Sequence, residues 1–228
     1  MSEVAIVIDD MEVKAKEGRR LIDVALEHGI FIPHLCHLPE IEDSYAGCRM
    51  CLVEVDGKAR PVTSCTERVR PGMMVRTDTP MVRRLQRSAL RLLLSAHHVD
   101  CGNCYANKRC ALQDLSKRLG VKLKVKEMRD LCPRLPLDET LGHVLHDPNK
   151  CVHCGNCVRL SQRLGIGAFH FSRRGLKMRV SLFPSGASKE ELERCMKVCP
   201  VGALIPAEFG KRQGDGIRKE IAKMSLME

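Results

Sequence analysis

The sequence predicts an α+β protein of three small cysteine-rich domains followed by a basic tail. Thirteen of its 228 residues are cysteines, and eleven of these fall into three groups along the chain. Aromatic residues make up only 3% and tryptophan is absent, so the large side chains that usually anchor a hydrophobic core are scarce. Strand-like runs surround the first cysteine group, whereas helical periodicity precedes the second. We therefore expect bound metal to stabilise domains at residues 1–78, 79–128 and 149–206, with the tail at 207–228.

The cysteine content has two common explanations, a secreted disulfide scaffold and a metal-binding protein. The N-terminus has no basic region, no long apolar run and no small-residue cleavage site, so it does not resemble a secretory signal. No apolar run is long enough to span a bilayer. Close C-x-x-C pairs suit one metal centre better than bridges to distant partners. The sequence thus predicts a cytoplasmic protein with reduced thiolates and no transmembrane segment.

The formal net charge of +10 would suit a nucleic-acid-binding protein. Metal clusters held by thiolates are anionic, however, and three of them, one for each cysteine group, would lower the charge to roughly +5 by ligand bookkeeping. We therefore expect no nucleic-acid partner. A basic module stabilised by zinc is the competing interpretation, and zinc found without acid-labile sulfide would distinguish it.

The first domain begins with a β-branched run at residues 4–8, a turn at Asp9–Asp10 and a second short strand. Helical spacing follows over residues 21–29. Residues 51–65 predict a hairpin that turns at Asp56–Gly57. A strand pair, a helix, a cysteine loop and a hairpin follow one another in the order of a β-grasp fold.

The first cysteine group has the spacing C-x11-C-x2-C-x13-C and consists of Cys36, Cys48, Cys51 and Cys65. Plant-type [2Fe–2S] ferredoxins use a related pattern, with a shorter first gap and a more distant fourth cysteine. Four thiolates from separate loops can enclose a two-iron core, so this group predicts a [2Fe–2S] cluster. Four thiolates can also hold a tetrahedral zinc ion, and the β-grasp order is what favours the cluster.

The second domain is predicted to be helical. The apolar side of its first helix is expected to carry Val82, Leu85, Ala89, Leu92, Leu93 and Ala96. The second ligand group follows with the spacing H-x3-C-x2-C-x5-C and consists of His97, Cys101, Cys104 and Cys110. Three thiolates and one imidazole predict a [4Fe–4S] cluster of raised potential, because histidine removes one negative charge. The adjacent His98 is the competing ligand.

The third group joins C-x2-C-x2-C to a later Cys-Pro pair and consists of Cys151, Cys154, Cys157 and Cys199. Bacterial two-cluster ferredoxins carry C-x2-C-x2-C-x3-C-P twice, and each fourth cysteine ligates the other cluster. The companion site here retains one cysteine, since its four positions hold Ser161, Lys189, Leu192 and Cys195. We therefore predict a bacterial-ferredoxin-like domain that keeps one [4Fe–4S] cluster. Cys195 is expected to pack as a small apolar residue, and Cys132 is left unassigned.

Together the three motifs resemble a known family. Their sequences are PHLC…AGCRMCLVEV…SC, HHVDCGNC…RCALQDL and HDPNKCVHCGNCVR…CPVGAL. In this order they are similar to the N-terminal cluster-bearing part of the large peripheral-arm subunit of complex I and to the iron–sulfur diaphorase small subunit of soluble NAD(P)-linked hydrogenases. They also resemble the front end of NAD-linked [FeFe] hydrogenases and formate dehydrogenases. The resemblance covers about residues 1–206.

The resemblance implies a non-catalytic electron-transfer subunit with one [2Fe–2S] and two [4Fe–4S] clusters, in which the only metal is iron. Its partners would be a flavin- and NAD(P)-binding subunit and a catalytic hydrogenase or formate dehydrogenase subunit. The chain stops soon after the third group, and no G-x-G-x-x-G motif follows a strand. Both features favour a separate relay subunit of a cytosolic hydrogenase. A relay subunit of an NAD-linked formate dehydrogenase and a free-standing multi-cluster ferredoxin are the alternatives.

Overall fold

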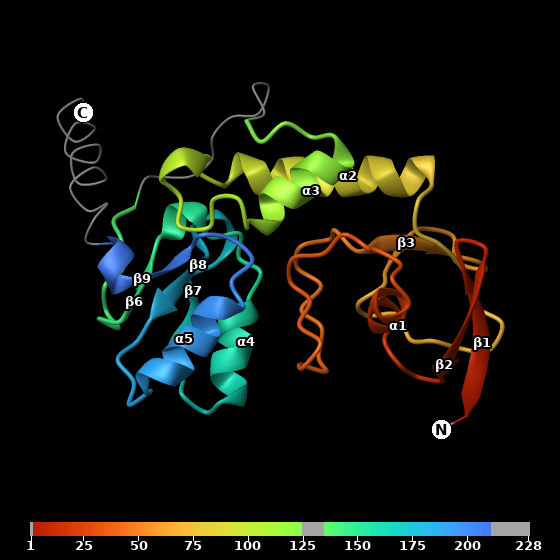
Figure 1. The fold of residues 1–228 in the computed structure, drawn as a ribbon, viewed down its shortest axis with the longest axis horizontal. Helices are drawn as coiled ribbons and strands as arrows, with labels where there is room; N and C mark the ends of the chain where they lie inside the picture. Colours follow the sequence, from red (N-terminus) through yellow and green to blue (C-terminus); the bar gives the residue numbers. More distant parts are fainter. Residues whose placement is uncertain (1, 125–134, 211–228) are drawn as a thin grey trace. The chain divides into compact units, whose positions relative to one another are not determined.

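The computed structural model describes residues 2–124 and 135–210, which form two compact units (Figure 1). The first unit contains the chain up to residue 92 together with residues 115–121, and the second contains the rest of the described chain. The helical segment that follows the first domain therefore contributes residues to both units. Cys132 and most of the predicted basic tail lie outside the described residues.

The first unit is built on a five-stranded sheet in the order β2-β1-β5-β3-β4. Its elements are β1 (Glu3–Ile8), β2 (Met11–Lys16), α1 (Leu21–Glu27), β3 (Leu52–Val55), β4 (Val62–Thr63) and β5 (Met74–Arg76). β1 pairs with β5 in parallel and with β2 antiparallel. This topology agrees with the predicted ferredoxin-type order. β5 was not expected from the sequence, because three residues are too few to show a period.

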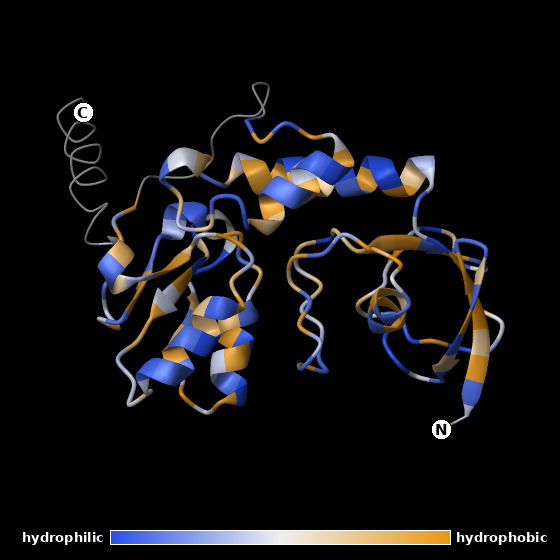
Figure 2. Cartoon of the chain, in the orientation of Figure 1, coloured by the Kyte–Doolittle hydropathy of each residue, from blue (hydrophilic) through white to orange (hydrophobic). Residues whose placement is uncertain are grey.

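The hairpin of β1 and β2 turns where the sequence predicts it. Asp9 and Asp10 both have positive φ angles, 47° and 66°, as the two central residues of a type I′ turn require. Alternate strand residues then face α1 in one apolar core, whose members include Ile6, Ile8, Val13, Leu21, Ile22, Val24, Val53 and Val75. Figure 2 shows mostly apolar colouring along β1 and β3 and mixed colouring of the helices. This core fixes the two ends of the loop that carries the first cysteines.

The middle segment forms two helices, α2 (Pro80–Ser95) and α3 (Ala111–Leu119). The predicted apolar side of α2 is right at Val82, which is buried, and wrong at Leu92, which is 64% exposed. Gln86 and Leu90, which were not predicted, are buried instead. Gln86 tolerates burial since its Nε2 donates a hydrogen bond of 3.1 Å to the Leu52 carbonyl oxygen. The buried row of α2 therefore consists of Val82, Gln86 and Leu90. Arginines occupy the neighbouring exposed edge of the helix.

The second unit is made of short elements around the second and third cysteine groups. They are η1 (Cys101–Asn103), β6 (Val144–His146), η2 (Pro148–Lys150), α4 (Asn156–Arg163), β7 (Phe169–Ser172), η3 (Gly175–Lys177), β8 (Arg179–Leu182), α5 (Lys189–Lys197) and β9 (Leu204–Pro206). β6 pairs with β9 and β7 pairs with β8, both antiparallel. A capping box opens α5, in which Ser188 Oγ accepts from the Glu191 amide and Glu191 Oε2 accepts from the Ser188 amide.

Within the described residues, none of the helices has the length and apolar character needed to cross a bilayer.

Candidate iron–sulfur sites

The four cysteines of the first group come together in the first unit. Cys36 and Cys48 lie on the loop between α1 and β3, Cys51 directly precedes β3, and Cys65 follows β4. Each is at most 5% exposed. Cys36 Sγ lies 3.4 Å from Cys48 Sγ, and a second thiol hydrogen bond joins Cys51 to Cys65. The site therefore consists of two thiol pairs, which is the arrangement that a two-iron core with two thiolates on each iron needs.

Backbone amides are already directed at one of these sulfurs. The hydrogen bond from the Cys36 thiol, together with backbone hydrogen bonds from Met50, Cys36 and Leu35, lowers the pKa of Cys48 to about 6 against the effect of burial. The same thiol contact raises the pKa of Cys36. Amide hydrogens near a ligating sulfur stabilise its negative charge, which is one way a protein adjusts the potential of a cluster.

A buried polar network supports the loop behind Cys36. Arg20 is 4% exposed, and its guanidinium donates to Asp23 Oδ2 at 2.6 Å, to the Pro39 carbonyl at 2.8 Å and to the Ile41 carbonyl at 2.5 Å. His37 Nε2 lies 2.8 Å from Asp23 Oδ1. This network holds the loop in place. No sequence signal pointed to it, because an isolated arginine before a helix is usually solvated.

The second group surrounds a cavity in the second unit. The cavity is lined by His97, His98, Asp100, Cys101, Cys104, Asn107, Cys110 and Gln113. His97 follows α2, Cys101 begins η1 and Cys110 precedes α3. Burial lowers the pKa of His97 to about 4, so its ring is neutral near pH 7, which is the form that binds a metal. Its Nδ1 is buried and has no hydrogen-bond partner among the described residues, as expected of an atom available to a metal.

The two adjacent histidines can be separated by mutation. His98 also lines the cavity, and its amide donates to the Asn149 carbonyl over 2.8 Å. We expect His97→Ala to remove or convert one [4Fe–4S] cluster, because it deletes the buried nitrogen, whereas His98→Ala should retain all the iron. Iron content and electron paramagnetic resonance of the reduced protein measure both outcomes. The reverse pattern would assign His98 as the ligand.

The third group lines another cavity of the second unit. Its lining includes Cys151, Cys154, Cys157, Cys199 and His146, together with apolar residues. Gly155, at the start of α4, has a φ of 74°, which a side chain would strain. Burial raises the pKa of Cys199, while hydrogen bonds from the backbone of Val201, Leu204 and Ala203 lower it. In the described part of the chain, no group hydrogen-bonds to the buried Nε2 of His146, so the cavity also has a polar group available to a cluster sulfur.

The positions of the companion ferredoxin site are filled in ways that do not suit a cluster. Ser161 is fully buried, and its Oγ accepts hydrogen bonds from the amides of Ala168 at 2.9 Å and Phe169 at 3.4 Å. Leu192 and Cys195 are buried at 3% and 0% exposure. These residues pack the volume that a second cluster would need.

Gly202 brings the second and third groups into contact, and the sequence did not identify it. A Cβ on Gly202 would overlap Cys104 Sγ and lie 3.2 Å from the Ala106 amide nitrogen. Nearby, the Ala111 amide donates to the Pro200 carbonyl over 3.0 Å. The backbone after Cys199 therefore lies directly against a thiol of the other group. The only sequence signal is a glycine three residues after a ligand, which a simple turn explains equally well.

The thiol pair of the first group suits more than one kind of metal centre. A tetrahedral zinc ion holds its four sulfurs about 3.8 Å apart, given zinc–sulfur bonds of about 2.3 Å, and the 3.4 Å between Cys36 Sγ and Cys48 Sγ is close to that value. In the described part of the chain, no three histidine, cysteine, aspartate or glutamate side chains are arranged to share one metal ion. The second and third groups instead line cavities.

Three family models match the chain in succession. Residues 1–80 match a 2Fe-2S iron-sulfur cluster binding domain, and residues 86–123 match the NADH-ubiquinone oxidoreductase-G iron-sulfur binding region. Residues 142–205 match the ferredoxin-like domain of NADH-quinone oxidoreductase subunit 3. The chain carries these three iron–sulfur domains in this order. The predicted α+β fold class, and the binding of 2Fe-2S and 4Fe-4S clusters, are thereby confirmed.

The iron–sulfur chain is also similar to parts of larger proteins. It is 31% identical to the mitochondrial 78 kDa subunit of NADH-ubiquinone oxidoreductase of Neurospora crassa, over 92% of this chain and 28% of the relative. It is also 31% identical to the mitochondrial NADH dehydrogenase iron-sulfur protein 1 of Solanum tuberosum, over 90% of this chain and 28% of the relative. The chain thus spans less than a third of the length of these curated relatives.

One solved structure matches this chain over most of the solved chain's length, unlike the longer curated relatives. A chain in the crystal structure of NAD+-reducing [NiFe]-hydrogenase in the H2-reduced state aligns with a TM-score of 0.80 and 28% identity. The alignment covers 88% of this chain and 86% of that chain. The predicted similarity to both complex I and hydrogenase subunits is confirmed.

Proposed function

We propose that this chain is an electron-transfer subunit that holds one [2Fe–2S] cluster and two [4Fe–4S] clusters and transforms no substrate itself. The [2Fe–2S] ligands are Cys36, Cys48, Cys51 and Cys65. The ligands of the two [4Fe–4S] clusters are His97, Cys101, Cys104 and Cys110, and Cys151, Cys154, Cys157 and Cys199. The observation that carries the proposal is the gathering of these twelve donors into three compact sets, each inside a matched iron–sulfur domain.

When bound, the clusters would supply one-electron redox chemistry, and the residues of the chain would position and insulate them. Burial of most of the thiols excludes water. The amides around Cys48 and Cys199 stabilise charge on the ligating sulfurs. Gly202, by having no side chain, lets the second and third sites approach each other closely within one unit, which favours transfer of electrons between them.

We further propose that the chain serves an NAD(P)-linked hydrogenase, between a flavin-bearing subunit and a catalytic subunit. This finer assignment is supported by the similarity to a chain of the NAD+-reducing [NiFe]-hydrogenase structure. A relay subunit of a formate dehydrogenase is the alternative from the sequence. Identifying the chains that co-purify with this one tests the choice: a nickel-bearing chain supports the hydrogenase, and a molybdenum- or tungsten-bearing chain supports the formate dehydrogenase.

The cluster content itself has a direct test. Protein prepared without oxygen should contain about ten irons and about ten acid-labile sulfides per chain, the sum for one two-iron and two four-iron cores. Iron and sulfide analysis, with zinc measured on the same sample, gives the result. Zinc in place of iron and sulfide would contradict the proposal, and a stable monomer that is fully loaded without partners would favour a free-standing carrier.

A further inference from the structure

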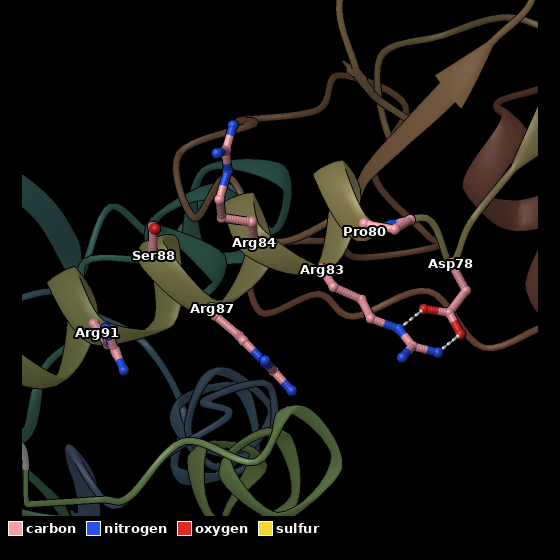
Figure 3. Close-up of a pocket in the computed structure, with 7 residues that line it drawn as sticks. All are labelled: Asp78, Pro80, Arg83, Arg84, Arg87, Ser88 and Arg91. Carbon is pink, nitrogen blue, oxygen red and sulfur yellow. Dashed lines mark hydrogen bonds and ion pairs between the residues drawn. The ribbon is translucent and has the colours of Figure 1, made fainter.

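A row of arginines follows the exposed edge of α2. Arg83, Arg87 and Arg91 recur every four residues, each one position after a buried residue, and Figure 3 shows all three leaving the helix on the same side. Arg84 also lies on the exposed surface of the helix. Residues 79–99 contain no aspartate or glutamate. The helix thus presents positive charge along this edge with no acidic neighbour on the helix itself.

The row borders two adjoining hollows of the first unit that share Asp78, Arg83 and Arg87. The larger, of about 630 Å³, is lined by Asp78, Pro80, Arg83, Arg84, Arg87, Ser88 and Arg91. The smaller, of about 420 Å³, adds Phe31, Pro33, Thr77, Gln86, Arg118 and Leu119. Five arginines and a single carboxylate therefore line these two adjoining hollows. We call the two hollows together the arginine groove.

Several of these guanidinium groups are held in place. Both carboxylate oxygens of Asp78 accept from Arg83, through its Nε and Nη2 (Figure 3). Arg87 Nε donates to the Leu119 carbonyl over 2.8 Å. Arg118 lies over the Phe31 ring, 4.3 Å from its centroid. Among the described residues, neither Arg84 nor Arg91 forms an ion pair, so these two groups can bind a ligand without breaking an internal bridge.

The charge arrangement costs the helix stability, because like charges one turn apart repel. Among the described residues, one carboxylate offsets part of that repulsion, because Asp78 forms an ion pair with Arg83. All four basic residues of the helix are arginine and none is lysine, and arginine is the residue that binds carboxylates through two parallel hydrogen bonds. Asp78 already binds Arg83 in this way. The groove is therefore suited to carboxylates in particular.

We propose that the arginine groove docks an acidic segment of a partner protein. Helix residues four positions apart are separated by about 6 Å along the helix axis, and alternate residues of an extended strand are about 6.7 Å apart. An extended segment with aspartate or glutamate at every second position therefore matches the spacing of the row. Nucleic acid suits the groove less well, because its only aromatic ring, Phe31, is already covered by Arg118. This surface does not depend on the cluster assignment.

The test is a titration of a fluorescein-labelled peptide of six Glu-Ala repeats with the cluster-loaded protein at low salt. Binding is measured by the fluorescence anisotropy of the peptide. We expect the Arg84→Glu, Arg91→Glu double variant to weaken binding at least tenfold. The matched control, Lys14→Glu with Arg60→Glu, makes the same change in charge at exposed positions of the same unit away from the groove, and should change binding less than twofold. Asp78→Asn should strengthen binding, because it releases Arg83.

Each result has a defined meaning. Equal weakening by the groove variant and the control would overturn the proposal, since binding would then follow net charge alone. Replacing Arg84 and Arg91 by lysine keeps the charge but removes the paired hydrogen bonds that arginine makes to a carboxylate. Weakened binding in this variant supports carboxylate recognition by the groove, and unchanged binding overturns it. A twelve-nucleotide single-stranded DNA that binds more tightly than the peptide, and loses affinity in the same groove variant, would reassign the groove to nucleic acid. Iron and sulfide content, measured on every variant, reports the clusters separately.

Discussion

Replacing Cys199 by serine should remove or convert the third cluster while the other two remain. Cys199 is far in sequence from the other three ligands of its set, yet it lines the same cavity. Backbone hydrogen bonds reach its sulfur from the residues that follow it, so the site is shaped around this thiol. Serine offers a harder oxygen ligand that suits iron–sulfur cores less well than thiolate. The protein should lose between one and four of about ten irons, measured by iron analysis and the visible spectrum.

Cys195→Ala is the matched control for this variant. Cys195 lies four positions earlier, is 0% exposed and has a pKa raised to about 11 by burial, so its thiol stays protonated. Its replacement removes a small apolar group from the core and should leave all three clusters intact. An unchanged spectrum in Cys199→Ser, or loss of a cluster in Cys195→Ala, would reject the ligand set of the third site.

Gly202→Ala should eliminate the cluster held by His97, Cys101, Cys104 and Cys110. The added Cβ would lie closer to Cys104 Sγ than nonbonded atoms can approach, and 3.4 Å from Ala106 Cβ. Either the thiol or the backbone after Cys199 must move, and overpacking of this kind typically costs about 1–3 kcal/mol of stability. We expect a loss of about four irons per chain, with the [2Fe–2S] signal of the first unit retained in the electron paramagnetic resonance spectrum.

Gly186→Ala supplies the comparison. Gly186 lies in the same unit, and a Cβ there would meet no heavy atom within 4 Å. Its replacement should therefore preserve the iron content, the spectrum and the unfolding midpoint. Full cluster retention in Gly202→Ala would mean that the two sites do not approach each other as closely as this contact requires.

The ligand sets could be predicted from the sequence because most of their geometry is local. In C-x2-C and C-x2-C-x2-C, the thiols are at most a few residues apart, so the spacing alone determines which donors can face one core. The start of α1 and the turn at Asp9–Asp10 were predictable for the same reason. Helical spacing of apolar residues specifies the helix, and two adjacent turn residues specify the turn. The assignment of individual ligands stays a prediction that the variants above test.

The remaining features depend on contacts between distant parts of the chain. Gln86 belongs to the buried row of α2 only because the Leu52 carbonyl accepts its amide hydrogen, and hydropathy could not anticipate that pairing.

The sequence by itself determined the three cysteine groups, their order and the class of cofactor that they hold, because those follow from residue type and short spacing. Only the tertiary structure decided that Gly202 must lack a side chain, that Arg20 supports the first cysteine loop, and that Phe31 and Arg118 adjoin the arginines of α2. These three features arise where segments far apart in sequence meet, and no local pattern encodes such a meeting.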